Sequence, residues 1–208
     1  MDQIIFRDRN DAGRQLAQRL QDFRVTDSIV LAIPRGGVPI GYQIASQLGL
    51  PLEVILSKKI AYPDNEEYAL GAVSTDSIVL NSDVYVDDEF IRMEAVRLRK
   101  VLKEKYNLFE SRLEEIDLSN RNIILVDDGI ATGSTVLACI ETLRKKNPAS
   151  ITVATPVVPA DRVRTFENAS DQFIFLHAPS LFYSVGAFYE HFDQVDDSEV
   201  KRLLSLCR

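Results

Sequence analysis

Five short apolar runs, separated by segments with helical periodicity, limit the fold of this 208-residue chain more than any other feature. The runs are apolar almost throughout and do not alternate with polar residues, which is typical of strands covered on both faces of a parallel sheet. They span residues 28–33, 52–56, 122–126, 151–155 and 173–176. The pattern predicts an α/β protein with a doubly wound, mostly parallel five-stranded sheet and flanking helices, which binds ligands at the carboxyl ends of its strands.

Amphipathic segments predict the helices that cover this sheet. Residues 38–48 and 134–146 each place apolar side chains on one stripe, and residues 11–23 predict a further helix outside the sheet order. The longest pattern, over residues 87–116, predicts a long inserted helix with a densely charged opposite face. Because glutamates are interspersed among the basic residues of that face, we interpret it as solvated and not as a phosphate or nucleic-acid patch.

Composition and charge exclude several classes of protein. The chain has 24 Lys plus Arg against 31 Asp plus Glu, a net charge of −7 that disfavours nucleic acid as the main partner. No basic segment followed by an apolar stretch opens it, and no run approaches the ~18 apolar residues that span a bilayer, so we expect a cytoplasmic protein with no membrane partner. The length suits one domain over residues 1–208. Cys139, Cys207, His177 and His191 lack disulfide-framework or metal-ligand spacing.

Residues 123–135 form the most informative segment, an apolar strand that ends in two acids and passes through a turn into a helix. The turn offers hydroxyl groups and backbone N–H groups at the positive end of a helix dipole, which together suit a phosphate. Asp127 and Asp128 can accept hydrogen bonds from a vicinal diol, and can also hold a hydrated Mg²⁺. A phosphate followed by a diol describes a ribose 5-phosphate. The residues of the predicted phosphate turn are Ala131, Thr132, Gly133, Ser134 and Thr135.

This segment resembles the phosphoribosyl pyrophosphate signature of type I phosphoribosyltransferases: four apolar residues, two acids, a short apolar link and Thr-Gly-x-Thr. The resemblance implies that Asp127 and Asp128 hold the ribose and, through water, Mg²⁺, while the turn holds the 5-phosphate. The family usually has a larger aliphatic residue at the position of Gly129, a departure that could loosen the turn. The alternative is an ordinary βα turn with an Asp-rich strand end and a Ser/Thr cap.

A second motif, Pro-Arg-Gly-Gly, follows the first predicted strand. Gly36 and Gly37 let backbone amides turn toward an anion, and Arg35 adds a fork of donors suited to pyrophosphate. The motif resembles the family's pyrophosphate loop, which often has a strained peptide beside its central residue, although alone it is equally consistent with an ordinary turn. A Walker A reading fails, because Tyr42 stands where lysine is required.

The third element, Lys58 and Lys59, lies at the end of the second predicted strand and precedes the polar stretch 61–68. In the family, a mobile loop follows this strand and closes over the reacting centre, and a lysine near it can meet pyrophosphate. The resemblance therefore implies a pyrophosphate contact, which we assign to Lys59 before Lys58. Either side chain could instead be a solvated lysine.

The chain as a whole also resembles a group of compact bacterial phosphoribosyltransferase-like proteins with no assigned substrate. The resemblance implies a Mg²⁺-dependent enzyme, which could form a homodimer, that moves the 5-phosphoribosyl group from phosphoribosyl pyrophosphate to a nitrogenous, nucleobase-like acceptor and releases pyrophosphate. Its catalytic groups would be Arg35, Lys59, Asp127 and Asp128. Ala131 stands where 6-oxopurine enzymes have an acid, so hypoxanthine-guanine activity by that mechanism is disfavoured, whereas adenine and orotate chemistry stay open.

Acceptor selection in this family comes from a hood, which we expect to be formed by residues 87–118 and 180–195. Phe182 or Tyr183 could stack on a planar base, or could pack within an aromatic cluster. A rival interpretation is a regulator of the same fold that senses phosphoribosyl pyrophosphate without turning it over. The acidic balance and the lack of a helix-turn-helix extension count against a nucleic-acid role for such a regulator. A hydrolase, or an accessory to a neighbouring enzyme, is a third possibility.

Overall fold

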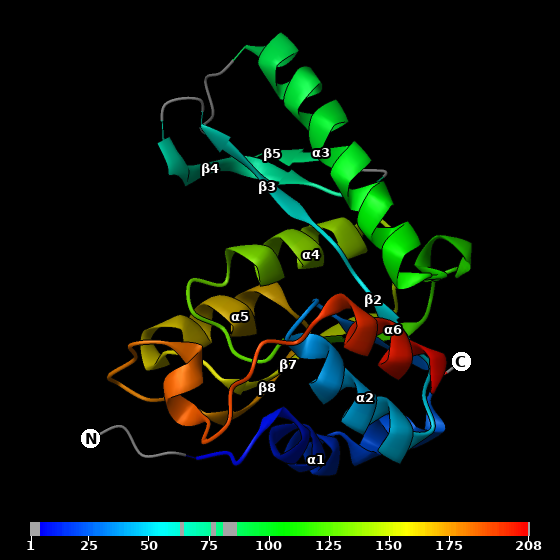
Figure 1. Ribbon diagram of the computed structural model, residues 1–208, viewed down its shortest axis with the longest axis vertical. Helices are drawn as coiled ribbons and strands as arrows, with labels where there is room; N and C mark the ends of the chain where they lie inside the picture. The colour runs from blue at the N-terminus through cyan, green and yellow to red at the C-terminus, as the bar shows by residue number, and fades with distance from the viewer. Residues whose placement is uncertain (1–4, 63–64, 76–77, 81–86, 208) are drawn as a thin grey trace.

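A parallel sheet of five strands lies at the centre of the computed structural model, which describes residues 5–62, 65–75, 78–80 and 87–207 (Figure 1). The strands are β1 (Ser28–Ala32), β2 (Leu52–Val54), β6 (Asn122–Val126), β7 (Ser150–Val157) and β8 (Gln172–His177). All pairings between neighbouring strands are parallel. The predicted α/β class and the five predicted strands are therefore confirmed, with small shifts at the strand ends.

The order of the strands reverses between β1 and β6. Across the sheet the order is β2-β1-β6-β7-β8, so the chain leaves β1 toward one edge and later adds three strands on its other side. The two central strands run in register, from Ser28 opposite Asn122 to Ala32 opposite Val126. Such a reversal leaves a crevice at the carboxyl ends of the two strands, where open α/β sheets bind ligands. The loops after β1 and β6 therefore define the place to look for a site.

Helices cover both faces of the sheet (Figure 1). One face carries α1 (Arg9–Arg19), α2 (Gly37–Leu48) and α6 (Asp197–Ser205), and the other carries α4 (Ser134–Arg144) and α5 (Val163–Ala169). Successive residues of β1 face opposite layers: Val30 belongs to the core shared with α1 and α2, whereas Leu31 belongs to the core shared with α4. Because both faces of the strand are buried, its sequence is apolar without interruption.

A second, antiparallel sheet was not predicted. It consists of β3 (Lys58–Tyr62), β4 (Asn65–Val73) and β5 (Ile78–Leu80), and it lies against α4 and the long helix α3 (Asp88–Phe109) (Figure 1). Lys58 and Lys59 therefore lie within β3, not at the end of the second strand, and much of the stretch 61–68 is strand; Pro63 and Asp64 lie outside the described residues. The sequence of β4 starts polar and does not alternate, so its pairing depends on distant helices that a local pattern does not reveal.

The helix predicted over residues 87–116 is shorter in the structure. It ends at Phe109 because Glu110 takes a left-handed conformation and its N–H bonds back to the carbonyls of Tyr106 and Asn107. A 3₁₀ turn, Leu113–Glu115, follows. The apolar periodicity continues past the helix end because Leu113 and Ile116 pack against the buried core of the sheet.

The N-terminal helix also differs from its predicted bounds of 11–23. It starts at Arg9, because the Asp8 side chain accepts a hydrogen bond from the Asp11 N–H and caps the helix there. It ends at Arg19, and the 3₁₀ helix Gln21–Val25 completes the segment that the periodicity had joined to it. The earlier start places Arg9 on the first turn of α1, beside the crevice described below.

Candidate functional site

Two adjacent carboxylates stand at the carboxyl end of β6, in the crevice of the sheet. Asp127 and Asp128 are both half-buried, and the Asp128 N–H donates to Asp127 Oδ1 at 2.9 Å. Burial, and then the neighbouring Asp128 charge, raise the pKa of Asp127 well above its ordinary value. Burial also raises the pKa of Asp128, although the Arg9 guanidinium opposes that shift. Hydrogen-bond donors or a cation stabilise two neighbouring carboxylates. A ligand with hydroxyl groups would provide the donors, and a bound metal ion would provide the cation.

Asp128 is contacted from three other segments of the chain. The Nε and Nη2 atoms of Arg9 each lie 2.8 Å from Asp128 Oδ2. A Cβ atom on Gly36 would lie 1.9 Å from the same oxygen, so only glycine leaves room for the carboxylate. The Tyr189 hydroxyl donates to the Asp128 main-chain carbonyl at 2.5 Å, and burial raises the pKa of that hydroxyl further than the nearby carboxylates do. The position of Asp128 is therefore set by the N-terminal helix, the loop after β1 and the C-terminal segment.

The turn between β6 and α4 has the form of an anion cradle. Gly133 has a φ of 79°, and a Cβ there would lie 2.1 Å from Phe166 Cζ, so the position requires glycine. The other residues of the 131–135 turn are exposed, and the Thr132 and Ser134 hydroxyl oxygens lie 3.4 Å apart. The helix begins at Ser134, and its first-turn N–H groups have no acceptor within the helix. The structure therefore presents hydroxyl and amide donors together at a helix N-terminus.

The departure from the family pattern at Gly129 has a structural explanation. A Cβ on Gly129 would lie 2.3 Å from a methyl group of Val185 and 3.0 Å from one of Val157. Val185, from the C-terminal segment, thus fills the space where other members carry an aliphatic side chain. The turn is packed and not loosened by this glycine.

The loop after β1 contains Arg35 and Gly37, and the role of this glycine differs from the one that the sequence predicts. The peptide bond between Pro34 and Arg35 is cis. The Gly37 N–H donates to the Ile33 carbonyl at 3.0 Å, and a Cβ on Gly37 would lie 2.6 Å from the Val126 carbonyl oxygen. Gly37 therefore lets α2 pack against β6, and its amide does not turn toward an anion as the sequence suggested.

Arg35 itself faces the C-terminal helix. Its Nη1 atom lies 3.6 Å from Asp197 Oδ1, at the first turn of α6, and both side chains are partly exposed. The Asp197 oxygen is buried and has no hydrogen-bond partner among the described atoms. The Arg35 guanidinium thus has an acidic neighbour within the chain.

A cavity of about 480 Å³ opens beside the 131–135 turn. Its described lining brings together Ser134 and Thr135 of the turn with three lysines and one acid, namely Lys58 and Lys59 of β3, Lys105 of α3 and Glu141 of α4. Lys59 and the turn are therefore neighbours, whereas Asp127, Asp128 and Arg35 do not line this cavity. Lys105 belongs to the charged face of α3 that we interpret as solvated, and it also lines this cavity.

Sequence reasoning also missed Arg9 and Tyr189. Arg9 belongs to a helix outside the sheet order, and Tyr189 belongs to the aromatic C-terminal segment. No local sequence pattern links either residue to the carboxyl end of β6. Of the two aromatic residues proposed for base stacking, Phe182 packs on Phe188 with ring centroids 5.4 Å apart, whereas Tyr183 is exposed.

The described residues offer few alternatives for a metal site. Within them, no three His, Cys, Asp or Glu side chains gather closely enough to hold an ion. Asp127 and Asp128 remain a pair of the kind that Mg²⁺ uses, since this ion takes one or two carboxylates and keeps several waters. Burial raises the pKa of the Cys139 thiol to about 12, which makes it inert at neutral pH. No helix in the described part of the chain is long and apolar enough to cross a membrane.

The phosphoribosyl transferase domain family matches residues 6–178, a segment that includes both loops of the crevice and the small sheet. This chain belongs to the phosphoribosyl transferase family. Its type I signature is the segment that ends in Asp127, Asp128 and the turn, and the family match ends before the C-terminal residues Val185 and Tyr189.

Two relatives are identical to this chain at more than a third of the aligned residues. The Mycobacterium tuberculosis H37Rv protein named "Putative phosphoribosyl transferase Rv0571c" is 38% identical over 205 residues, which cover 96% of this chain and 46% of that protein. The chain thus spans about half the length of the curated relatives it matches. The crystal structure of TT1426 from Thermus thermophilus is 34% identical, with a TM-score of 0.87 over 96% of this chain and 97% of that one.

A more distant likeness concerns the fold alone. A hypothetical protein from Neisseria gonorrhoeae, solved with bound ppGpp, is 17% identical, with a TM-score of 0.51 over 100% of this chain and 99% of that chain.

Proposed function

We propose that this chain binds phosphoribosyl pyrophosphate with Mg²⁺ and transfers the phosphoribosyl group to a nitrogenous acceptor, with release of pyrophosphate. The observation that carries the proposal is the placement of Asp127 and Asp128 at the strand reversal, between the exposed 131–135 turn and the loop after β1. Family membership supports transfer from phosphoribosyl pyrophosphate in general. The nitrogenous acceptor is inferred from the family resemblance, and the metal from the paired carboxylates of the site.

Each part of the ligand has a chemical counterpart in the crevice. The turn would bind the 5-phosphate through its hydroxyl and first-turn amide groups, and the two carboxylates would accept hydrogen bonds from the ribose hydroxyl groups. Lys59, together with Lys58 and Lys105, supplies positive charge beside the turn for the pyrophosphate. Arg35 would join them if its contact with Asp197 is exchanged for the ligand.

The reaction needs little covalent help from the protein. As the bond between the anomeric carbon and the pyrophosphate oxygen breaks, its electron pair leaves with pyrophosphate. An acceptor nitrogen forms the new bond to that carbon, and the proton of that nitrogen passes to solvent. Catalysis then depends on positioning and on cationic groups near the leaving oxygens. Mg²⁺, when bound, would neutralise charge on the pyrophosphate, with Asp127 and Asp128 as the protein groups suited to its water shell.

Measuring pyrophosphate release tests the proposal and separates it from its rival. The protein is incubated with phosphoribosyl pyrophosphate, Mg²⁺ and a panel of acceptors that includes adenine, orotate, hypoxanthine and guanine. We expect release with at least one acceptor, and loss of release in the double variant Asp127→Asn, Asp128→Asn. Asp161→Asn is the matched control, because that carboxylate is exposed and pairs only loosely with Arg162 at 3.9 Å.

The outcomes separate the candidate functions. Binding of phosphoribosyl pyrophosphate without release for any acceptor would favour the sensing regulator. Absence of both binding and release would show that the proposed function is wrong.

A further inference from the structure

The Arg9 side chain is engaged on all sides at the edge of the crevice. It is 11% exposed, and its Nε and Nη2 atoms both contact Asp128 Oδ2 at 2.8 Å. Its Nη1 atom donates to the Asp193 carbonyl at 2.7 Å, and its Cζ atom lies 3.8 Å from the centroid of the Phe192 ring. A guanidinium with three engaged nitrogens and a stacked face has little freedom to move.

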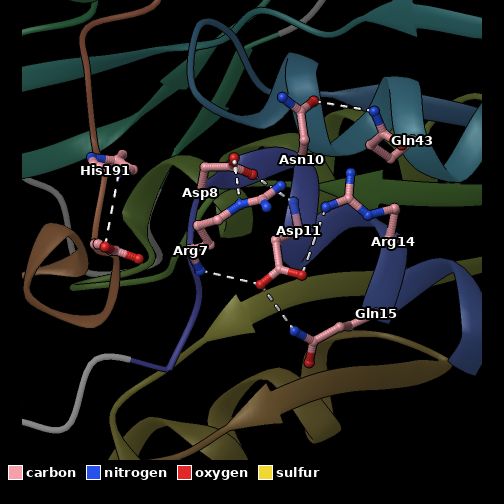
Figure 2. A network of polar contacts seen from close by, with 9 residues as sticks. Arg7, Asp8, Asn10, Asp11, Arg14, Gln15, Gln43 and His191 are labelled. Atoms are coloured by element: carbon pink, nitrogen blue, oxygen red, sulfur yellow. Dashed lines mark hydrogen bonds and ion pairs between the residues drawn. The ribbon is translucent and has the colours of Figure 1, made fainter.

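A network of hydrogen bonds holds the residues on either side of Arg9 at the start of α1, among them Asp8, Asn10 and Asp11 (Figure 2). Asp8 Oδ1 accepts from the Asp11 N–H at 2.7 Å. Asp11 Oδ2 in turn accepts from the Arg7 N–H at 3.1 Å and from the Gln15 amide at 3.3 Å. Every residue of this network lies within two turns of Arg9, so the first turn of α1 is held in one conformation.

Two further contacts tie this turn to the rest of the molecule. The Gln43 amide of α2 donates to Asn10 Oδ1 at 3.1 Å (Figure 2), and the His191 N–H donates to the Arg7 carbonyl at 2.9 Å. Arg9 is therefore oriented before any ligand arrives, both by α2 and by the C-terminal segment that also supplies Phe192.

We propose that Arg9 is a positioning residue of the ribose site, an inference that rests on the proposed function. Both of its contacts fall on Oδ2 of Asp128, the oxygen that also packs against Gly36, so Oδ1 is the oxygen that remains for a ribose hydroxyl. The positive charge also offsets the repulsion between Asp127 and Asp128. Arg9 thus presents Asp128 as an oriented anionic acceptor without itself touching the ligand.

Arg9 also limits where a cation can bind on the two carboxylates. A guanidinium on Oδ2 disfavours a second cation at that oxygen, which leaves Asp127 and the remaining oxygen of Asp128 for a hydrated Mg²⁺. Removal of Arg9 would remove the contacts that orient the Asp128 carboxylate, and discrimination for the ribose diol would then decline. Binding of the 5-phosphate at the turn would be unaffected.

Calorimetric titrations with ribose 5-phosphate and with its 2-deoxy and 3-deoxy analogues test this role. The measured quantity is the ratio of dissociation constants between an analogue and the parent sugar phosphate. We expect the wild type to prefer the full diol, and Arg9→Gln to reduce that preference on the order of tenfold. Arg9→Lys keeps the positive charge but loses the two-nitrogen contact of the guanidinium, and it should retain part of the preference for the diol. Arg19→Gln is the matched control, because Arg19 is exposed in the last turn of the same helix, away from the network that holds Arg9.

Three results would be decisive. If Arg9→Gln weakens all three ligands equally, Arg9 is merely structural and the inference is wrong; an unchanged preference overturns it as well. If Arg9→Gln fails to fold, judged by circular dichroism, Arg9→Lys carries the test, and a wild-type preference in that variant overturns the inference. If the wild type binds the sugar phosphates without preferring the diol, the ribose role of the carboxylates fails first, and the proposed function fails with it.

Discussion

The two sides of the candidate site are built in opposite ways. On the sheet side, the loops after β1 and β6 are packed so closely that Gly36, Gly37 and Gly133 each lack room for a Cβ atom. On the side of the small sheet, Lys58 and Lys59 are exposed, and they lie on a strand that packs against α3 and α4. Under the proposed function, the fold itself would organise the groups for ribose and phosphate, whereas the positive charge for pyrophosphate would lie on exposed lysine side chains.

The largest expected effect is on the packed side, where Gly133→Ala tests how firmly the phosphate turn is fixed. The left-handed backbone should cost alanine about 1 kcal/mol of unfolding free energy, and overpacking against Phe166 should cost about 1–3 kcal/mol more. Gly49→Ala is the control, because Gly49 has a similar φ of 70° but nothing within 4 Å of its Cβ position. Urea denaturation should show Gly133→Ala losing more unfolding free energy than Gly49→Ala. Equal losses would mean that the turn is not held by Phe166.

The next effect concerns the exposed side, where Lys59→Ala should weaken binding of phosphoribosyl pyrophosphate by ~1.5–3 kcal/mol if a charge-assisted hydrogen bond is lost. Ribose 5-phosphate, which lacks the pyrophosphate, should bind almost as before. Lys105→Ala should act in the same direction, and Lys100→Ala, an exposed lysine on the same helix, should have little effect. Calorimetry with both ligands measures the difference. An equal loss for the two ligands would contradict a pyrophosphate role for the cavity.

Asp127→Asn should improve stability at neutral pH while it weakens binding of phosphoribosyl pyrophosphate. Because the pKa of Asp127 is raised above its ordinary value of 3.8, the folded state binds more protons than the unfolded state above that pH. Stability should therefore decline as pH rises through the window that starts near 3.8, and the variant should reduce this decline, to which Asp128 also contributes. Urea denaturation at pH 4 and pH 7 should show the variant gaining on the parent at the higher pH, while its affinity for phosphoribosyl pyrophosphate falls. A variant that loses stability at pH 7 would contradict the assigned environment of Asp127.

The smallest effect tests whether Arg35 is shared between Asp197 and a ligand. The two side chains are 36% and 37% exposed, so their ion pair contributes only about 0–1 kcal/mol. Asp197→Asn should therefore tighten phosphoribosyl pyrophosphate binding by about fivefold or less, and the gain should vanish in combination with Arg35→Ala. A gain that survives Arg35→Ala would show that Asp197 acts through another group.

The sequence predicts the packed side of the site better than the exposed side, for a physical reason. Asp127, Asp128 and the 131–135 turn belong to one short segment of sequence, and parallel strands bring the loop with Arg35 to the same edge. Arg9, Lys105 and Tyr189 come from α1, α3 and the C-terminal segment, and their positions depend on packing between distant elements. Local periodicity predicts that these elements exist, and it does not predict which of their side chains reach the crevice.

The glycines teach a related lesson. The sequence identifies Gly36 and Gly37 as special, but the reason it suggests, backbone approach to an anion, differs from the one observed. Gly36 makes room for the Asp128 carboxylate, and Gly37 for the Val126 carbonyl. Gly129 departs from the family pattern because Val185 occupies its side-chain space, a compensation between residues far apart in the chain.

Chemical denaturation in the presence of phosphoribosyl pyrophosphate and Mg²⁺ tests the central claim most directly. A ligand that binds only the folded state raises the unfolding free energy by ~2.7 kcal/mol at a hundredfold excess over its dissociation constant. We predict a rise of that size for the wild type, and little rise for the double variant Asp127→Asn, Asp128→Asn, measured relative to each protein without ligand. An unchanged unfolding curve for the wild type at millimolar ligand, or an equal rise in both proteins, would contradict the assignment of this crevice as the phosphoribosyl site.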